Sequence, residues 1–142
     1  HDQPRGASLF IPEEDYGFYS LSALATIIFC ERGLPFLYQG QEIGMSNRQW
    51  KYDEFNDLET INQYQIALKA GMSKEQALEF ARHHSRDNAR TPMQWSSEEN
   101  AGFSKGKPWM PVNENYKVVN VAEEEKEYGS ILNFLQAIDR IL

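Results

Sequence analysis

The pattern of apolar positions predicts a helix over residues 19–32 and a short buried strand directly after it. Apolar side chains in the helical segment recur three and four positions apart and also occupy the opposite side, so this helix requires cover on two sides. Gly33 stops the helix, and Pro35 prevents its continuation. Leu34–Tyr38 is a continuous apolar and aromatic run, which is typical of a strand that is buried on both faces.

The sequence changes from apolar to polar at the end of this predicted strand. Gln41 and Glu42 lie between Gly40 and Gly44, so polar groups and permissive backbone arrive where a buried strand would emerge. Taken alone, the run fits a plain buried strand better than a strand that carries a functional site, and the neighbouring segments decide between the two. An apolar helix before it and a long polar connection after it indicate one βα unit of a parallel barrel, with chemistry at the C-terminal end of the strand.

Helix-capping signals mark the starts of four further helices. An Asn or Ser followed three residues later by Glu or Gln is the capping-box pattern, in which two side chains satisfy free backbone amides. The first two helices are separated by Gly71 and are expected to form a hairpin. The final helix is expected to bury Ile131, Phe134, Leu135, Ile138 and Leu142. The four starts are Asn56 with Glu59, Ser73 with Gln76, Asn120 with Glu123, and Ser130.

Two segments are predicted to be loops, residues 6–16 and the much longer residues 85–119. A connection as long as the second, without elements of its own, is usually functional or disordered. Its aromatic content argues against disorder. Aromatic side chains of this connection and of a further predicted polar loop at residues 46–55 could stack on sugars, but we assign them to the cores of the loops themselves. They are Trp50, Trp95, Phe103, Trp109 and Tyr116.

Composition narrows the class of protein. The 142 residues suit one domain with a real core, and a net charge of −7 argues against a general nucleic-acid or acidic-membrane binder. The longest apolar stretch is too short to span a bilayer, and no signal peptide is visible, so we expect a cytoplasmic protein. A single cysteine, Cys30, excludes an intrachain disulfide, and its apolar setting predicts a buried structural thiol.

Charged residues form two groups with competing interpretations. His1 and Asp2 are a potential catalytic pair, or Asp2 only caps a turn. Arg86 and Arg90 bind a ligand, or they form a loop-pinning ion-pair network with Asp87. The acidic segment 52–59 lacks the glycine and ligand spacing of a calcium loop, so we read it as a solvated face and expect no metal or cofactor.

Several stretches of the chain together resemble the oligo-1,6-glucosidase branch of the α-amylase family, glycoside hydrolase family 13. That branch also contains dextran glucosidases, trehalose-6-phosphate hydrolases and sucrose isomerases. The resemblance covers essentially the whole chain, in order. The matching stretches are HDQPR at residues 1–5, GLPFLYQGQEIGM at 33–45, SRDNARTPMQW at 85–95, NAGFSKGKPW at 100–109 and VNENYKVVNV at 112–121.

The resemblance implies an α/β fold, namely the C-terminal quarter of a TIM (β/α)₈ barrel. Residues 1–142 would form a single partial domain that runs from the end of barrel strand seven to barrel helix eight. Residues 46–119 would be a helical-hairpin and loop excursion after strand eight. In isolation we expect a mostly α-helical chain with one or two short strands and a long ordered loop.

The resemblance also implies a function, that of a fragment of a retaining α-glucosidase that hydrolyses short α-linked glucosides such as α-1,6 oligosaccharides. The family's nucleophile and acid/base would lie upstream of residue 1, so the fragment alone is expected to be inactive. A sucrose isomerase or transglucosidase of the same family is the alternative. A non-catalytic homologue or helical interaction module is a third reading.

The family's functional positions fall on six residues of this chain. Asp2 matches the third carboxylate and His1 its hydroxyl-binding neighbour, both counted as catalytic. Arg86 matches an arginine that holds the terminal glucose. Glu59 matches an acid that helps select the leaving sugar, or it merely completes a helix cap with Asn56. The residues that line an adjacent subsite, or serve structural roles, are Gln3 and Arg5.

Expected partners follow from these roles: an oligosaccharide or disaccharide substrate and the rest of the parent barrel, with no nucleic acid and no membrane. An isolated chain would leave Leu34–Tyr38 without strand partners. We therefore expect it either to self-associate through this segment or to pack the segment irregularly.

Overall fold

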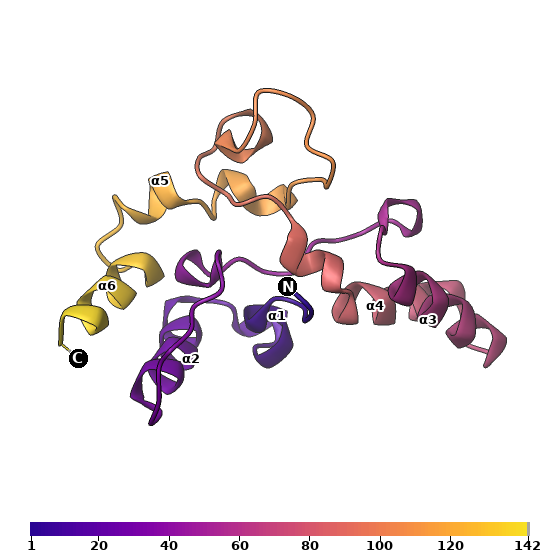
Figure 1. The fold of residues 1–142 in the computed structure, drawn as a ribbon, viewed down its shortest axis with the longest axis horizontal. Helices are drawn as coiled ribbons and strands as arrows, with labels where there is room; N and C mark the ends of the chain where they lie inside the picture. Colours follow the sequence, from indigo (N-terminus) through magenta and orange to yellow (C-terminus); the bar gives the residue numbers. More distant parts are fainter. Residues whose placement is uncertain (142) are drawn as a thin grey trace.

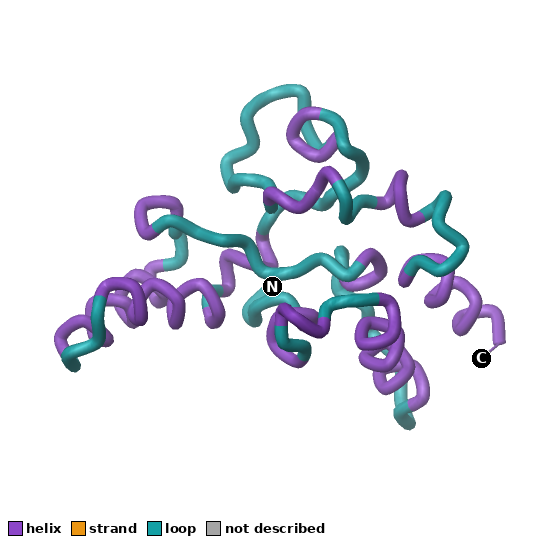
Figure 2. Tube along the Cα trace, turned by 180° about the vertical axis from the view of Figure 1, so that it is seen from behind, coloured by secondary structure: helices purple, strands orange, loops and turns teal. Residues whose placement is uncertain are grey.

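The computed structural model describes residues 1–141, which form an arch of helices and 3-10 turns joined by ordered loops (Figure 1). Its α-helices are α1 Gly6–Phe10, α2 Phe18–Cys30, α3 Leu58–Lys69, α4 Lys74–His84, α5 Val121–Glu124 and α6 Ile131–Ile141. Its 3-10 turns are η1 Glu13–Asp15, η2 Gln41–Ile43, η3 Tyr52–Glu54, η4 Arg86–Arg90, η5 Glu99–Gly102 and η6 Glu114–Lys117. No strand forms within residues 1–141, as the tube in Figure 2 shows.

Helix α2 packs on α6 at one end of the arch. Ala25 of α2 is buried with Ile131 and Leu135 of α6. The Phe18 and Phe134 rings meet edge to face, with centroids 5.8 Å apart. The other side of α2 stays open, and Ile27 is 59% exposed. The two-sided apolar pattern of this helix is thus covered on one side only.

Leu34–Tyr38 is not a strand, which corrects the prediction of one or two short strands. The segment lies along α2, where Leu37 shares an apolar crevice with α2 side chains, but its backbone has no strand partner in residues 1–141. Leu34 and Phe36 are 78% and 81% exposed. A strand exists only through hydrogen bonds to a neighbour, so an apolar run without neighbours packs irregularly instead. This is one of the two outcomes expected above.

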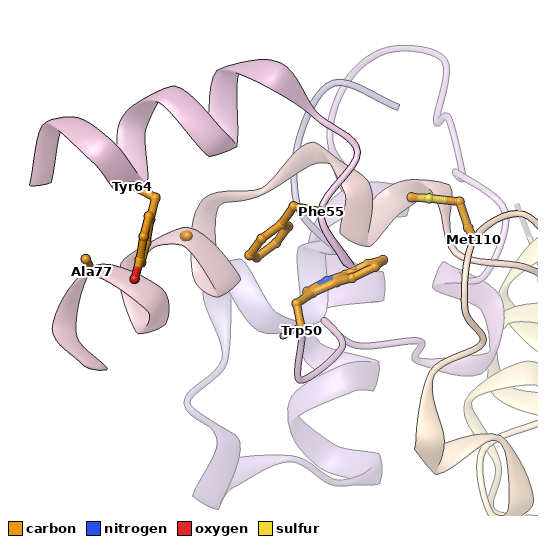
Figure 3. Packing of buried hydrophobic residues seen from close by; sticks show 6 residues of the cluster. Trp50, Phe55, Tyr64, Ala77 and Met110 are labelled. Carbon is orange, nitrogen blue, oxygen red and sulfur yellow. The ribbon is translucent and has the colours of Figure 1, made fainter. Parts of the chain in front are cut away.

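Helices α3 and α4 form the predicted hairpin at the other end of the arch. Ser73 opens α4 with the predicted capping box, because its Oγ accepts from Gln76 N and the Gln76 side chain accepts from Ser73 N. Helix α3 is capped by Asp57 rather than by the predicted Asn56. The core under the hairpin contains Trp50, Phe55, Tyr64, Ala77, Ala81 and Met110 (Figure 3).

Asn88 joins this core to the centre of the arch. Its Oδ1 accepts from Arg48 N at 3.0 Å and from Trp50 Nε1 at 2.6 Å. Its Nδ2 donates to the carbonyl oxygens of Arg82 at 2.7 Å and Ser85 at 3.0 Å. Asn88 is fully buried, so these four bonds hold loop 46–50 against the end of α4 without competition from bulk water.

Of the remaining predictions for individual segments, some are confirmed and others are wrong. Residues 6–16, predicted as loop, contain α1 and η1. Asn120 and Ser130 cap α5 and α6 as predicted, through Glu123 N and Asn133 N. Leu142, expected on the inner face of α6, lies outside the described residues. Within residues 1–141 no helix is long and apolar enough to cross a membrane.

Burial corrects two predictions about individual side chains. Cys30 is exposed at the end of α2, so it is not a buried thiol in this chain. Among the loop aromatics, Trp50 is fully buried, but Trp95, Phe103 and Trp109 are 51%, 50% and 75% exposed. These three therefore do not form a core of the long loop.

Candidate functional site

An open pocket of about 630 Å³ lies between the first residues of the chain and the α3–α4 hairpin. Asp2 and Gln3 border it on one side, and the start of α3 brings Asp57 and Glu59 to it. The α3–α4 hairpin supplies an apolar wall that includes Ile66 of α3, Met72 of the turn and Phe80 of α4. The pocket therefore combines a charged end with an apolar end.

Arg86 stands at the centre of the charged end. Its Nη2 donates to Asp57 Oδ1 at 2.5 Å, and the same nitrogen lies 3.6 Å from Glu59 Oε2. Its Nη1 lies 3.6 Å from Asp2 Oδ1. The hydrogen bond to Asp57 raises the pKa of Arg86 above its usual value, so the guanidinium stays charged. Its buried Nε has no hydrogen-bond partner in residues 1–141.

Asp57 is the buried member of this group. Its Oδ2 accepts from Thr60 N at 3.1 Å and from Thr60 Oγ1 at 2.7 Å, as an N-cap does. Burial opposes ionisation of this carboxyl, but the bonds from Arg86 and Thr60 outweigh it and lower the pKa of Asp57 to about 2. The backbone is fixed as well, since Asp87 Oδ2 accepts from Asn56 N and Asp57 N at 2.7 and 2.9 Å.

Asp2 lines the pocket, and His1 pairs with it. His1 Nε2 is 3.1 Å from Asp2 Oδ2, and the Asp2 side chain is 59% exposed. Arg90 Nη2 lies 3.6 Å from Asp2 Oδ1, and Arg90 Nη1 lies 3.5 Å from Asp87 Oδ1. Arg90 thus belongs to the predicted ion-pair network, while the exposed Asp2 side chain faces two guanidinium groups.

Arg5 does not line the pocket, and the structure places it among backbone carbonyls instead. It is 2% exposed, and its Nε and Nη1 donate to Asn88 O at 3.0 Å and Gln39 O at 2.6 Å. Its Nη2 donates to Thr91 Oγ1 at 3.2 Å. Burial lowers the pKa of Arg5 to about 10. Of the two roles weighed for Arg5, this geometry favours the structural one over a sugar subsite.

Glu59 faces the pocket from the second position of α3 and is 61% exposed. Its competing role as a helix-cap partner of Asn56 is wrong, because Asp57 caps the helix. Gln3 lines the same pocket. Asp57 was not among the predicted site residues, and its only signal in the sequence is that Asp, like the adjacent Asn56, is a preferred N-cap residue.

The described residues hold no group of three or more His, Cys, Asp or Glu side chains that is arranged to bind a metal ion. The pocket is lined by carboxylates, the Arg86 guanidinium and an apolar wall. Such fixed, charged donors and acceptors beside an apolar surface suit a polyhydroxylated ligand with a hydrophobic ring face.

Solved structures define the class of protein to which this arrangement belongs. The chain is 39% identical to trehalose-6-phosphate hydrolase of Bacillus licheniformis, with a TM-score of 0.92 over 99% of this chain and 26% of that one. It is 39% identical to isomaltulose synthase of Klebsiella sp. LX3, with a TM-score of 0.88 over the same shares. The fold is accordingly the C-terminal quarter of a (β/α)₈ barrel of the glycoside-hydrolase class, as the resemblance implied.

The family follows from the sequence comparison. The profile of the α-amylase catalytic domain matches residues 1–141, and the chain belongs to the α-amylase family, glycoside hydrolase family 13. It is 41% identical over 139 residues to an oligo-1,6-glucosidase of Halalkalibacterium halodurans and 41% identical over 142 residues to a glucan 1,6-alpha-glucosidase of Streptococcus pneumoniae. These matches cover 97% and 99% of this chain but 25% and 26% of the relatives, so it spans about a quarter of their length.

Proposed function

We propose that this chain is the substrate-facing C-terminal quarter of a retaining α-glucosidase that acts on short α-linked glucosides, including α-1,6 oligosaccharides. The observation that carries the proposal is the cluster of Asp2, Glu59 and Asp57 around Arg86 in one open pocket. Its support is the similarity to proteins named for 1,6-glucosidase activity.

Retaining hydrolysis requires a nucleophilic carboxylate and an acid/base about 5–5.5 Å apart on either side of the scissile bond. We assign this pair to the part of the longer polypeptide that precedes residue 1. Asp2 then accepts hydrogen bonds from hydroxyls of the distorted sugar ring, and His1 donates to one of them. These bonds lower the barrier only insofar as they strengthen while positive charge develops on the ring.

Arg86 and Glu59 provide the specificity in this proposal. The loosely engaged Nη1 of Arg86, 3.6 Å from Asp2 Oδ1, is the donor available to a terminal glucose. Glu59, more exposed than the other acids at this end, accepts from the leaving sugar. Gln3 lines the space between them. The 142-residue chain alone lacks the reacting pair and should show no turnover.

The test is hydrolysis by the full-length protein that contains this chain, with isomaltose, phosphorylated trehalose and sucrose as substrates. We expect release of glucose with retained anomeric configuration. Asp2→Asn should lower kcat by at least about 100-fold, since one preorganised transition-state contact is worth about 10²–10³. The control is Asp139→Asn, an exposed acid on α6 far along the chain from the pocket. No turnover of any of the three sugars would refute the glucosidase assignment and favour a non-catalytic homologue.

Sucrose isomerisation or glucosyl transfer is the second candidate. It is favoured by the similarity to isomaltulose synthase and to the trehalulose synthase of Pseudomonas mesoacidophila, each 39% identical over 99% of this chain. A double-displacement enzyme can pass its glycosyl group to a sugar instead of water. Product analysis with sucrose separates the two: glucose and fructose indicate hydrolysis, whereas an isomeric disaccharide indicates isomerisation.

We further propose that the rest of the parent barrel covers the open side of α2 and pairs with Leu34–Tyr38. The support is the exposure of Ile27, Leu34 and Phe36 in the chain by itself. Sedimentation of the isolated chain provides the test. Self-association that Ile27→Glu abolishes would support an exposed docking face, and a stable monomer in both forms would contradict it.

A further inference from the structure

We propose that Asp57 is a positioning residue that holds Arg86 from behind, so that Asp2 and Glu59 remain free to bind the sugar. The inference rests on the function proposed above and extends it to a residue that does not itself contact the substrate. It is carried by a difference among the three acids around Arg86 in distance, burial and constraint.

Distance separates Asp57 from the other two acids. Its Oδ1 lies 2.5 Å from Arg86 Nη2, which is a direct, charge-assisted hydrogen bond. Asp2 Oδ1 and Glu59 Oε2 each lie 3.6 Å from the guanidinium, beyond hydrogen-bond range. Asp57 is therefore the only hydrogen-bond partner of the Arg86 side chain among the described residues.

Burial and constraint separate them as well. The Asp57 side chain is 4% exposed, whereas those of Asp2 and Glu59 are 59% and 61% exposed. The other oxygen of Asp57 is held by the amide and hydroxyl of Thr60. The amides of residues 56 and 57 are held by Asp87, which lies next to Arg86 in the sequence. Asp57 is thus a rigid acceptor, because both its side chain and its backbone are held, and it fixes one end of the Arg86 guanidinium.

This arrangement sets the direction of the guanidinium. Because Asp57 holds Nη2 and the Nε atom is buried, Nη1 is the nitrogen directed to a ligand. A fixed donor fork costs less entropy on binding than one that must be ordered by the sugar. Without Asp57 the Arg86 side chain, which is 34% exposed, would collapse onto Asp2 or Glu59 and mask a group that the substrate needs.

The variant that tests this is Asp57→Asn in the full-length protein, because Asn is as good a helix N-cap as Asp and retains an acceptor for Thr60. It removes the charge that holds Arg86. We expect kcat/KM for isomaltose to fall about 10- to 100-fold, with a rise in KM as the larger part. The matched control is Ser73→Ala, which removes the N-cap of α4 and costs a similar amount of stability away from Arg86. It should leave kcat/KM within about twofold.

A double-mutant cycle distinguishes positioning from a general structural effect. In an Arg86→Ala background, Asp57→Asn should change kcat/KM by less than about threefold, because no guanidinium remains to be held. An equal fall in both backgrounds would overturn the positioning role, as would wild-type kinetics in the single variant. A parent protein without glucosidase or isomerase activity would refute the proposed function and this inference together, whereas an active parent with an unaffected Asp57→Asn variant refutes the inference alone.

Discussion

Replacing Asn88 by alanine is expected to be among the most destabilising single changes in the chain. Its side chain makes four hydrogen bonds, two as acceptor and two as donor, at a position with no solvent exposure. Alanine leaves two donors, Arg48 N and Trp50 Nε1, and the carbonyl oxygen of Arg82 without partners, while Ser85 O keeps the bond from the backbone N–H of residue 88 at 3.3 Å. It also leaves a small cavity between loop 46–50 and the end of α4.

The magnitude follows from counting these bonds. Each intramolecular hydrogen bond contributes about 1 kcal/mol net, and a buried group left unpaired costs about 1–3 kcal/mol. Four bonds give about 4 kcal/mol, and a water molecule in the new cavity could recover about 1 kcal/mol of that. We therefore expect a loss of about 3 kcal/mol, a large part of the total stability of a domain this size.

Urea unfolding followed by tryptophan fluorescence measures this loss, because Trp50 is buried while Trp95 and Trp109 are at least half exposed. Asn133→Ala is the control, since its Nδ2 donates to two carbonyls, Glu124 O and Glu127 O, at a half-buried site. It should cost about 1 kcal/mol or less. A loss below about 1 kcal/mol for Asn88→Ala would show that this side chain does not tie the loop to the hairpin.

Three further outcomes are expected. Gly40→Ala should cost about 2 kcal/mol or more in urea unfolding, because φ is +95° there and the new Cβ would lie 2.5 Å from Met45 Sδ; a neutral result would contradict the left-handed turn. The pKa of Asp57 is lowered from 3.8 to about 2, so its contribution to stability is complete above pH 4 and is lost as pH falls toward 2. After discounting for the partly exposed Arg86, this contribution is about 1 kcal/mol. In thermal melts, Asp57→Asn should therefore reduce the fall in melting temperature between pH 4 and pH 2. Cys30 of the isolated 142-residue chain should react completely with a thiol reagent without denaturant, and protection would mean that α2 is covered.

Local signals predicted much of the helical structure. Ser73 and Gln76 satisfy each other's backbone amides within one turn, so their pattern needs no information from elsewhere in the fold. The start of α3 shows where this stops. Asn56 and Asp57 are adjacent N-cap candidates. In the structure Asp57 is the cap, and Arg86 and Asp87, about thirty positions later, bind this part of the chain. No local pattern contains that information.

Non-local partners also explain the remaining errors. Leu34–Tyr38 has the composition of a buried strand, but a strand and its burial depend on neighbours that residues 1–141 do not supply. The family resemblance pointed to Asp2, Gln3, Glu59 and Arg86 as site residues, and the structure brings these four to one pocket. The same resemblance also placed Arg5 among the site residues. Only the structure shows that the guanidinium of Arg5 lies among carbonyls.

The anchoring of Arg5 has a mechanical consequence. It ties the first residues of the chain to Asn88, within the turn η4 that presents Arg86, and to Thr91, directly after that turn. Asp2 and Arg86, which lie side by side at the charged end of the pocket, are therefore held in a fixed position relative to each other. Room for a bulkier sugar has to come from the apolar wall of the α3–α4 hairpin, and enzyme engineers seeking altered substrate size would do best to vary side chains there.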